Sequence, residues 1–224
     1  MLMRQAGRRA VVAPRFRLTT DPKHGLPVAP NLLARDFGAA RAANVKWASD
    51  ITYLTYLTYL WTPEGWLYLA VVLYLAVVLD LFPRRVVGWA MQARLDRCLV
   101  LKAPEAALGY RRPEAGLLHH SDRGSQYASG DSQAKLEAWG ILCSMSRRGK
   151  CSRKQARLRW DNAPVESFFG TLKQELVNRC HFATRDVARQ EVLRCSSTSR
   201  SGITGSVVIR AWGISAPSSS SAGR

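Results

Sequence analysis

The chain has 224 residues, a formal net charge of +17 and a hydrophobic content of 47%. This length provides for one domain with a sizeable core plus extensions. The basic excess favours a polyanion such as nucleic acid as the partner, because Lys and Arg that neutralise phosphates release condensed counterions. Charge alone is equally compatible with a basic surface that binds nothing.

Cysteine usage and hydropathy argue against further classes of protein. The five cysteines form no CxxC pair, which favours reduced thiols in a cytoplasm over a disulfide framework or a zinc site. The apolar run at 66–79 has 14 residues, whereas roughly 18–20 are needed to cross a bilayer. We therefore expect no membrane partner. We also expect no signal peptide, because no apolar stretch of the needed length follows Arg4, Arg8 and Arg9.

Three regions follow one another along the chain. Residues 1–45 are basic and interrupted by prolines, which predicts an N-terminal arm and linker. Residues 46–190 carry the periodic apolar patterns of a folded core, and residues 191–224 form an irregular tail.

The core begins with two repeated tracts that predict long strands. TYL occurs three times from Thr52 to Leu60, and YLAVVL occurs twice from Tyr68 to Leu79, so each tract is six residues longer than a single copy. Six is an even number, so side chains beyond the repeat keep their faces. Thr62–Gly65 has the composition of a turn. The hypothesis is a hairpin, lengthened by about 20 Å at roughly 3.3 Å per residue, that protrudes past the sheet edge.

Alternating strands and helices complete the core. A third strand is expected near 86–91, a helix at 95–110, a strand at 116–120, a helix at 132–139 and a strand at 141–144. A last helix should follow Asp161 and Asn162, since either side chain can cap free amides and Pro164 suits the first turn. The pattern predicts an α/β fold with five strands and intervening helices.

Three acids stand in segments that suit the presentation of a carboxylate: Asp50 in WASDITYL, Asp122 in HHSDRGSQY and Glu166 in DNAPVESFF. Displacement at phosphorus builds charge on the entering and leaving oxygens, and two divalent cations about 3.5–4 Å apart can stabilise both. Mg²⁺ prefers hard oxygen ligands and keeps several waters, so a few carboxylates suffice. The three acids are therefore a candidate two-metal site.

The motifs HHSDRGSQY, SMSRRG and DNAPVESFFGTLKQEL resemble the catalytic core of OrfB-type insertion-sequence transposases, relatives of retroviral integrases. The resemblance runs from about residue 18 to 191 and implies a ribonuclease-H-like fold, with a mixed five-stranded sheet flanked by helices. It also implies an Asp-Asp-Glu triad at Asp50, Asp122 and Glu166, with two Mg²⁺ or Mn²⁺ ions, and DNA strand transfer. Element ends and target would be double-stranded DNA, bound by a homo-oligomer in a bacterial cytoplasm, at the nucleoid.

The spacing of the triad departs from this family. Forty-three residues separate Asp122 from Glu166, whereas the family is similar to integrases in having thirty-five. Ser152–Arg159 supplies eight residues that the family lacks, and we interpret it as an insertion that leaves the triad assignment intact.

Polar residues around the acids are candidates for DNA contact. Arg123 and Gln126 follow Asp122 in a loop, and Lys173 lies on the same helix face as Glu166. Lys173 is equally compatible with an ordinary solvated lysine, and Asn162 with a purely capping role. His119 and His120 are more often scaffold than ligands at a strand end. The full DNA-contact set is Lys173, Arg123, Gln126, Asn162, Arg147 and Arg148.

The tail suggests a frameshift near residues 190–195. Codons for 201–215 can be chosen so that a shifted frame spells WYNRQRRHSGLGYL, which looks like the basic end of the transposase family. Two functions stay open: an active transposase, and a DNA-binding remnant that has lost catalysis; a nuclease that stops at hydrolysis is less favoured. The sequence leaves open whether an upstream partner protein supplies the end-binding part.

Overall fold

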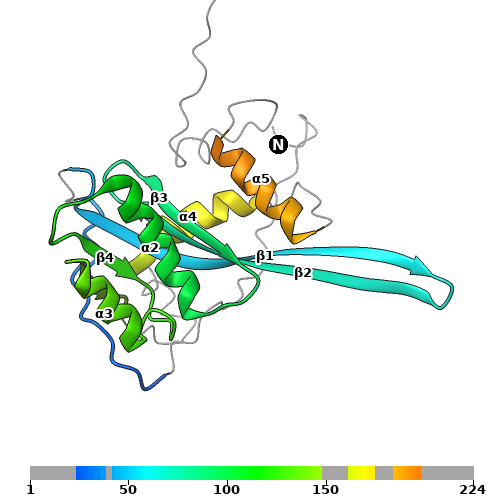
Figure 1. The fold of residues 1–224 in the computed structure, drawn as a ribbon, viewed down its shortest axis with the longest axis horizontal. Coiled ribbons are helices and arrows are strands. Elements are labelled where there is room, and N and C mark those ends of the chain that lie inside the picture. The colour runs from blue at the N-terminus through cyan, green and yellow to red at the C-terminus, as the bar shows by residue number, and fades with distance from the viewer. Residues whose placement is uncertain (1–23, 39–41, 148–160, 175–183, 198–224) are drawn as a thin grey trace, which may run out of the picture.

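The computed structural model describes residues 24–38, 42–147, 161–174 and 184–197, and its centre is a five-stranded mixed sheet (Figure 1). The strand order is β3-β2-β1-β4-β5. The first three strands in sequence pair antiparallel, whereas β4 pairs parallel to both β1 and β5. The strands are β1 (Lys46–Thr62), β2 (Gly65–Asp80), β3 (Arg85–Gln92), β4 (Leu118–Ser121) and β5 (Leu142–Met145). The predicted α/β fold with a mixed five-stranded sheet flanked by helices is confirmed.

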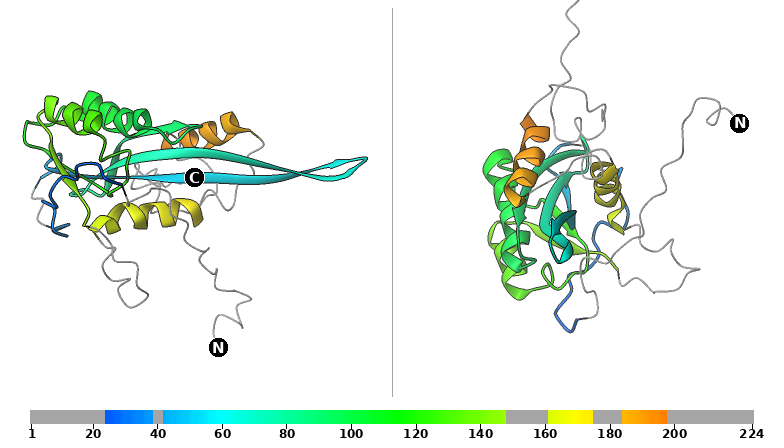
Figure 2. Two further views of the ribbon diagram at one scale, coloured as in Figure 1. Left: turned by 90° about the horizontal axis from the view of Figure 1, so that it is seen from below. Right: turned by 90° about the vertical axis from the view of Figure 1, so that its right-hand side faces the viewer.

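Helices cover both faces of this sheet. α2 and α3 lie on one face and α4 on the other (Figure 2). α2 begins at Asp96, whose carboxylate accepts from Leu99 N at 3.0 Å. It packs so closely on β3 that a Cβ at Gly88 would lie 2.6 Å from Ala107 Cβ. The helices are α2 (Arg97–Arg111), α3 (Gly130–Ala138), α4 (Ala163–Leu172) and α5 (Arg185–Ser197).

Two apolar layers sandwich the sheet, one on each face. The layer that includes α4 contains Ala48 and Leu54 of β1 and also Val192 of α5. The opposite layer contains Trp47 and Ile51 of β1 together with the buried face of α2. The two layers use alternate residues of β1, as expected for a strand buried on both faces.

The β1–β2 hairpin extends well beyond the helices (Figure 1). Its register runs without a bulge from Trp47↔Asp80 to Thr62↔Gly65. Gly65, with φ of +123°, ends the turn in a conformation that favours glycine. Near the tip the side chains of Trp61 and Leu67 are 67% and 54% exposed. The hypothesis of a protruding hairpin is confirmed.

The N-terminal region differs from expectation where the structure describes it. Residues 24–37, expected to be a linker, pack on the domain, and Leu33 is only 1% exposed within the layer that includes α4. α5 also continues past the predicted core boundary at 190. The insertion at 152–159 and the tail from 198 lie outside the described residues. None of the described helices is long and apolar enough to cross a membrane.

Candidate active site

Asp50 lies in β1, the central strand of the sheet, between β2 and β4. Its position in the alternation is that of Ala48 and Leu54, so it shares their face beneath α4. Its Oδ1 accepts from Ile51 N at 2.7 Å, which stiffens the side chain.

Asp122 follows the last residue of β4. Ser121 pairs with Ser49 in the parallel register, so the chain leaves β4 beside the strand position that precedes Asp50. The carboxylate of Asp122 accepts from Gly124 N at 2.9 Å, which closes a tight loop. Parallel pairing thus brings the second acid to the first.

Glu166 lies in the first turn of α4 and is exposed. Apolar residues on the other side of the helix fix its orientation. These residues, which are buried as their helical spacing predicted, are Val165, Phe168, Phe169 and Leu172.

The charges of the three acids act on one another. Burial raises the pKa of Asp50 well above its usual value, and the carboxylates of Asp122 and Glu166 raise it further. The hydrogen bond from Ile51 and the charge of Lys173 act in the opposite direction. All three predicted acids therefore share one electrostatic neighbourhood.

This arrangement suits a divalent cation in its chemistry. Carboxylate oxygens are the donors that Mg²⁺ and Mn²⁺ prefer, and a cation would relieve the repulsion that raises the pKa of Asp50. Within the described ranges, however, no three His, Cys, Asp or Glu side chains converge closely enough to hold an ion by themselves. Waters and substrate oxygens would have to complete a coordination shell, as is usual for Mg²⁺.

Lys173 lies close to the acids. Its ammonium stands 4.5 Å from the ring centroid of Tyr53, a cation–π contact that anchors the half-buried side chain. Burial lowers the pKa of Lys173, while the charge of Asp50 raises it. Tyr53 of β1 thereby holds the Lys173 ammonium near the acids.

The two histidines of β4 belong to the scaffold. His120 is buried, with Nδ1 at 2.8 Å from Ser144 Oγ and Nε2 at 3.2 Å from Ser146 Oγ. His119 is equally buried, and neither ring nitrogen has a partner among the described residues. Burial lowers the pKa of each to about 4. Both rings are neutral at physiological pH and support the strand that delivers Asp122.

The structure distributes the expected DNA contacts unevenly. Arg123 and Gln126 are partly exposed on the loop after Asp122, and Arg148 lies outside the described residues. Arg147 is exposed, but its guanidinium is held by Asp161.

Asn162 requires correction, because it is only 3% exposed and cannot reach DNA from this position. Its side chain makes no cap hydrogen bond for α4. It donates instead to Ser49 O at 2.9 Å, across to β1.

Sequence reasoning missed two residues of the site. Asp161 is the first: its partners Asn31 and Arg35 lie 130 and 126 residues away in sequence, so no local pattern indicated them. Tyr127 ends the HHSDRGSQY motif, and its buried hydroxyl lies close enough to the acids that, after burial, Asp50 and Asp122 raise its pKa further. Its ring belongs to the apolar layer opposite α4.

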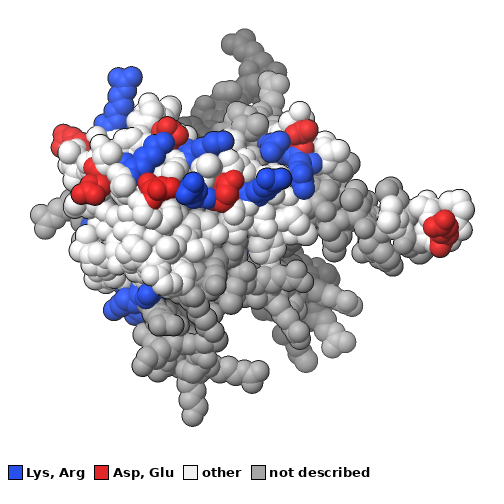
Figure 3. Space-filling view, turned by 60° about the horizontal axis from the view of Figure 1, so that its bottom comes forward, with Lys and Arg blue, Asp and Glu red and all other residues white. Residues whose placement is uncertain are grey.

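The surface in Figure 3 carries positive and negative side chains side by side rather than one basic patch. Ion pairs between α2 and α3 are part of this pattern: Arg97 contacts Asp131, and Lys135 contacts Glu105. The described residues on this face therefore do not form a continuous phosphate-binding surface.

Known sequences share the motifs around the acids. Two family models, each described as an integrase core domain, match residues 40–151 and 166–193. Together the matches include all three acids of the candidate site.

Curated relatives are bacterial. An uncharacterized 31 kDa protein of insertion element IS600 from Shigella sonnei is 45% identical over 78% of this chain and 56% of its own length. Transposase InsF of insertion sequence IS3A from Escherichia coli is 42% identical over 85% of this chain and 59% of its own length. The chain thus spans little more than half the length of these relatives. Among solved structures, the HTLV-2 integrase catalytic core domain in complex with magnesium is 16% identical, with a TM-score of 0.48, over 77% of this chain and 98% of that one.

Proposed function

The chain belongs to the integrase core domain family, and from that premise we propose that it is the catalytic part of an insertion-sequence transposase. It cleaves DNA at element ends and joins them to a target by metal-dependent strand transfer. The observation that carries the proposal is the placement of the three acids: Asp50 lies on the face of β1 beneath α4, Asp122 follows β4 where that strand pairs with β1, and Glu166 lies in the first turn of α4. Identity of 42% to transposase InsF over most of this chain supports the same activity.

Asp50, Asp122 and Glu166 supply the oxygen donors for two Mg²⁺ or Mn²⁺ ions. Divalent ions held by these residues would stabilise the charge that develops on the entering and leaving oxygens at phosphorus. The InsF relatives are bacterial, so the site of action is a bacterial cytoplasm at the nucleoid.

Three side chains near the acids are suited to hold DNA. Lys173, placed by Tyr53, contacts a phosphate beside the acids. Arg123 and Gln126 contact the strand that passes over the β4 loop. Pairing of two element ends requires a homo-oligomer, and an upstream partner polypeptide supplies the part that recognises those ends.

A strand-transfer assay with matched variants tests this function. The substrate is a labelled duplex carrying the inverted repeat that flanks the gene, with supercoiled target and Mg²⁺. Glu166→Gln should abolish product while leaving DNA affinity close to wild type. Glu137→Gln changes the same chemical group on the exposed part of α3 and should retain full activity.

The other outcomes discriminate between functions. Equal product from wild type and Glu166→Gln would remove Glu166 from the mechanism. DNA binding without product from wild type would favour the catalytically inactive remnant. Nicked donor without joined product would favour a nuclease of the same fold.

A further inference from the structure

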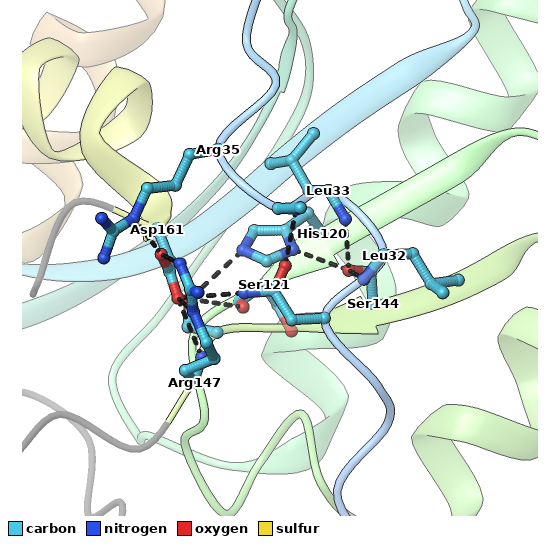
Figure 4. Close-up of polar contacts among 11 residues, drawn as sticks. Leu32, Leu33, Arg35, His120, Ser121, Ser144, Arg147 and Asp161 are labelled. Atoms are coloured by element: carbon cyan, nitrogen blue, oxygen red, sulfur yellow. Dashed lines mark hydrogen bonds and ion pairs between the residues drawn. The ribbon is translucent and has the colours of Figure 1, made fainter.

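Asp161, five residues before Glu166, is a buried carboxylate with an unusual number of donors. Its side chain is 3% exposed. One oxygen accepts from Arg35 Nε at 2.6 Å and from Arg147 Nη2 at 2.8 Å. The other accepts from Asn31 Nδ2 at 2.9 Å and from Arg147 N and Nε at 3.0 and 3.1 Å (Figure 4). The ordinary acceptor capacity of a carboxylate, about four lone-pair sites, is filled, so Asp161 has none left for a cation or for DNA.

These donors come from separate parts of the chain. Asn31 and Arg35 belong to residues 24–37, which we call the strap, and Arg147 follows the end of β5. Asp161 itself immediately precedes the first turn of α4. One side chain thereby joins the strap, an edge strand and the helix that carries Glu166.

The start of α4 is also tied to β1. Asn162 donates to Ser49 O, the carbonyl just before Asp50. Arg35 and Arg147 bind Asp161, and β1 binds Asn162. These contacts fix the position of the first turn of α4 relative to Asp50. The mutual effect of Glu166 and Asp50 depends on that position.

The strap is anchored independently of Asp161. Leu32 N and Leu33 N both donate to Ser144 Oγ, at 2.9 and 3.3 Å, and this hydroxyl also meets His120 Nδ1. Figure 4 shows these contacts side by side with the Asp161 cluster. At the other end of the strap, His24 Nε2 lies 2.9 Å from the carbonyl of Arg123, the residue after Asp122. The strap thus contacts the chain next to the second acid and, through Asp161, next to the third.

The buried charge of Asp161 restricts the geometry of its cluster with Arg35 and Arg147. Burial by itself would raise the pKa of Asp161, but hydrogen bonds from Arg147 and Arg35 hold it well below its usual value. Removal of one partner from a buried ion pair leaves a charge without compensation and is strongly destabilising locally. The cluster therefore favours one geometry.

From these contacts we propose that Asp161 is a positioning residue: gripped by the strap and by Arg147, it sets the first turn of α4 and so places Glu166 relative to Asp50. The expected effect of Asp161 on strand transfer rests on the proposed function. Positioning by Asp161 also gives residues 24–37 a role, since movement of the strap would be transmitted to both the second and the third acid.

The test uses the full chain and three substitutions. Arg35→Gln removes the ion pair between the strap and Asp161 and leaves the Arg147 contacts in place. Asp161→Asn keeps the shape of the side chain but removes its charge. Arg97→Gln is the matched control. Arg97 of α2 is paired with Asp131 in an exposed contact, and α2 lies on the face of the sheet opposite α4.

Three measurements separate positioning from general stability: the strand-transfer rate at saturating DNA, the DNA dissociation constant, and hydrogen exchange of the amides at 167–170, which donate to the carbonyls of the first turn of α4. Arg35→Gln and Asp161→Asn should each lower the rate roughly 10- to 100-fold, the range found for residues that orient metal ligands. DNA affinity should change less than about twofold and half-maximal rate should require more Mg²⁺, since a displaced ligand weakens the ion's site. The double variant should lose little more than Asp161→Asn alone, because the two residues act through one contact.

The exchange measurement keeps the inference separate from catalysis. Arg35→Gln and Asp161→Asn should speed exchange of the amides at 167–170, while Glu166→Gln and Arg97→Gln should leave it unchanged. This expectation holds even if wild type transfers no strands, in which case the proposed function fails and the positioning role stands. Should Asp161→Asn fail to fold, Arg35→Gln carries the test. Wild-type exchange in α4 and a wild-type rate in Arg35→Gln, or a loss explained entirely by weaker DNA binding, would overturn the inference.

Discussion

The two ends of the β1–β2 hairpin have the same backbone pairing but different surroundings. At the base, Leu75 is fully buried between the sheet and its helices, whereas Leu67 near the tip is 54% exposed. The register is continuous from one end to the other. Hydrogen-bonded pairing can thus be extended by a repeat, but burial comes only where helices cover the strand. Acids that need a desolvated and ordered setting are accordingly found at the base.

A matched pair of leucines on β2 should give the largest contrast. Leu75→Ala opens a cavity in the core and should lower the free energy of unfolding by about 2–5 kcal/mol. Leu67→Ala removes the same atoms from an exposed ribbon and should change it by less than about 0.5 kcal/mol. Urea unfolding of both variants measures the contrast. Equal losses would mean that the tip is covered by a part of the chain outside the described residues.

Acidic pH should lower the folding stability of the sheet through the buried histidines of β4. In the unfolded chain a histidine binds a proton near pH 6.5, whereas in the folded chain His119 does so only near pH 4. Between these values the unfolded state holds more protons, so stability is complete above about pH 6.5 and falls as the pH decreases.

His119→Leu should flatten this dependence, by about 2–3 kcal/mol in the difference between pH 7 and pH 4. Chemical denaturation across that range measures it, and His120 should account for the dependence that remains. A variant whose stability falls as steeply as that of wild type would show that His119 is not the group that titrates.

The ionised carboxylate of Asp50 should lower the free energy of unfolding at neutral pH. Its folded pKa is raised above the usual 3.8, first by burial and then by the charge of Asp122. The folded state therefore binds the proton more tightly than the unfolded state, and stability is lost as the pH rises from about 3.8 through the raised value.

Asp50→Asn should accordingly melt a few degrees higher than wild type at neutral pH without metal, and the gap should close below pH 3.8. Addition of Mg²⁺ should raise the melting temperature of wild type more than that of the variant, since the ion binds the folded state only. Differential scanning calorimetry measures both effects, with Glu137→Gln as a surface control. A variant that melts lower than wild type in metal-free buffer at pH 7 would contradict this account.

The smallest effect should come from shortening the tip. Deletion of Thr55–Leu60 together with Tyr68–Leu73 removes six residues from each strand and joins Leu54 opposite Leu67, so the parity of both strands is kept. We expect stability and strand transfer close to wild type, measured by thermal unfolding and by the assay described above. Loss of transfer with an intact fold would assign the tip a role in DNA binding or assembly.

Much of this architecture could be predicted because it is encoded locally. The repeated TYL and YLAVVL tracts predicted β1 and β2, and the apolar spacing of α4 identified the side that Val165 and Phe168 bury. Motif resemblance selected Asp50, Asp122 and Glu166, whose charges the fold brings together. The direction of Asn162 was not predictable, because its partner Ser49 is 113 residues away in sequence.

The sequence by itself determined the strands, the helices and the three acids, since alternation, helical spacing and compact motifs depend on residues close together in the chain. Only the tertiary structure decided that residues 24–37 are a strap and that Asp161 joins it to α4. The contact between Asn31 and Asp161 spans 130 residues. Such a contact arises when separate elements meet and a buried charge must find donors, so no local pattern in the chain announces it.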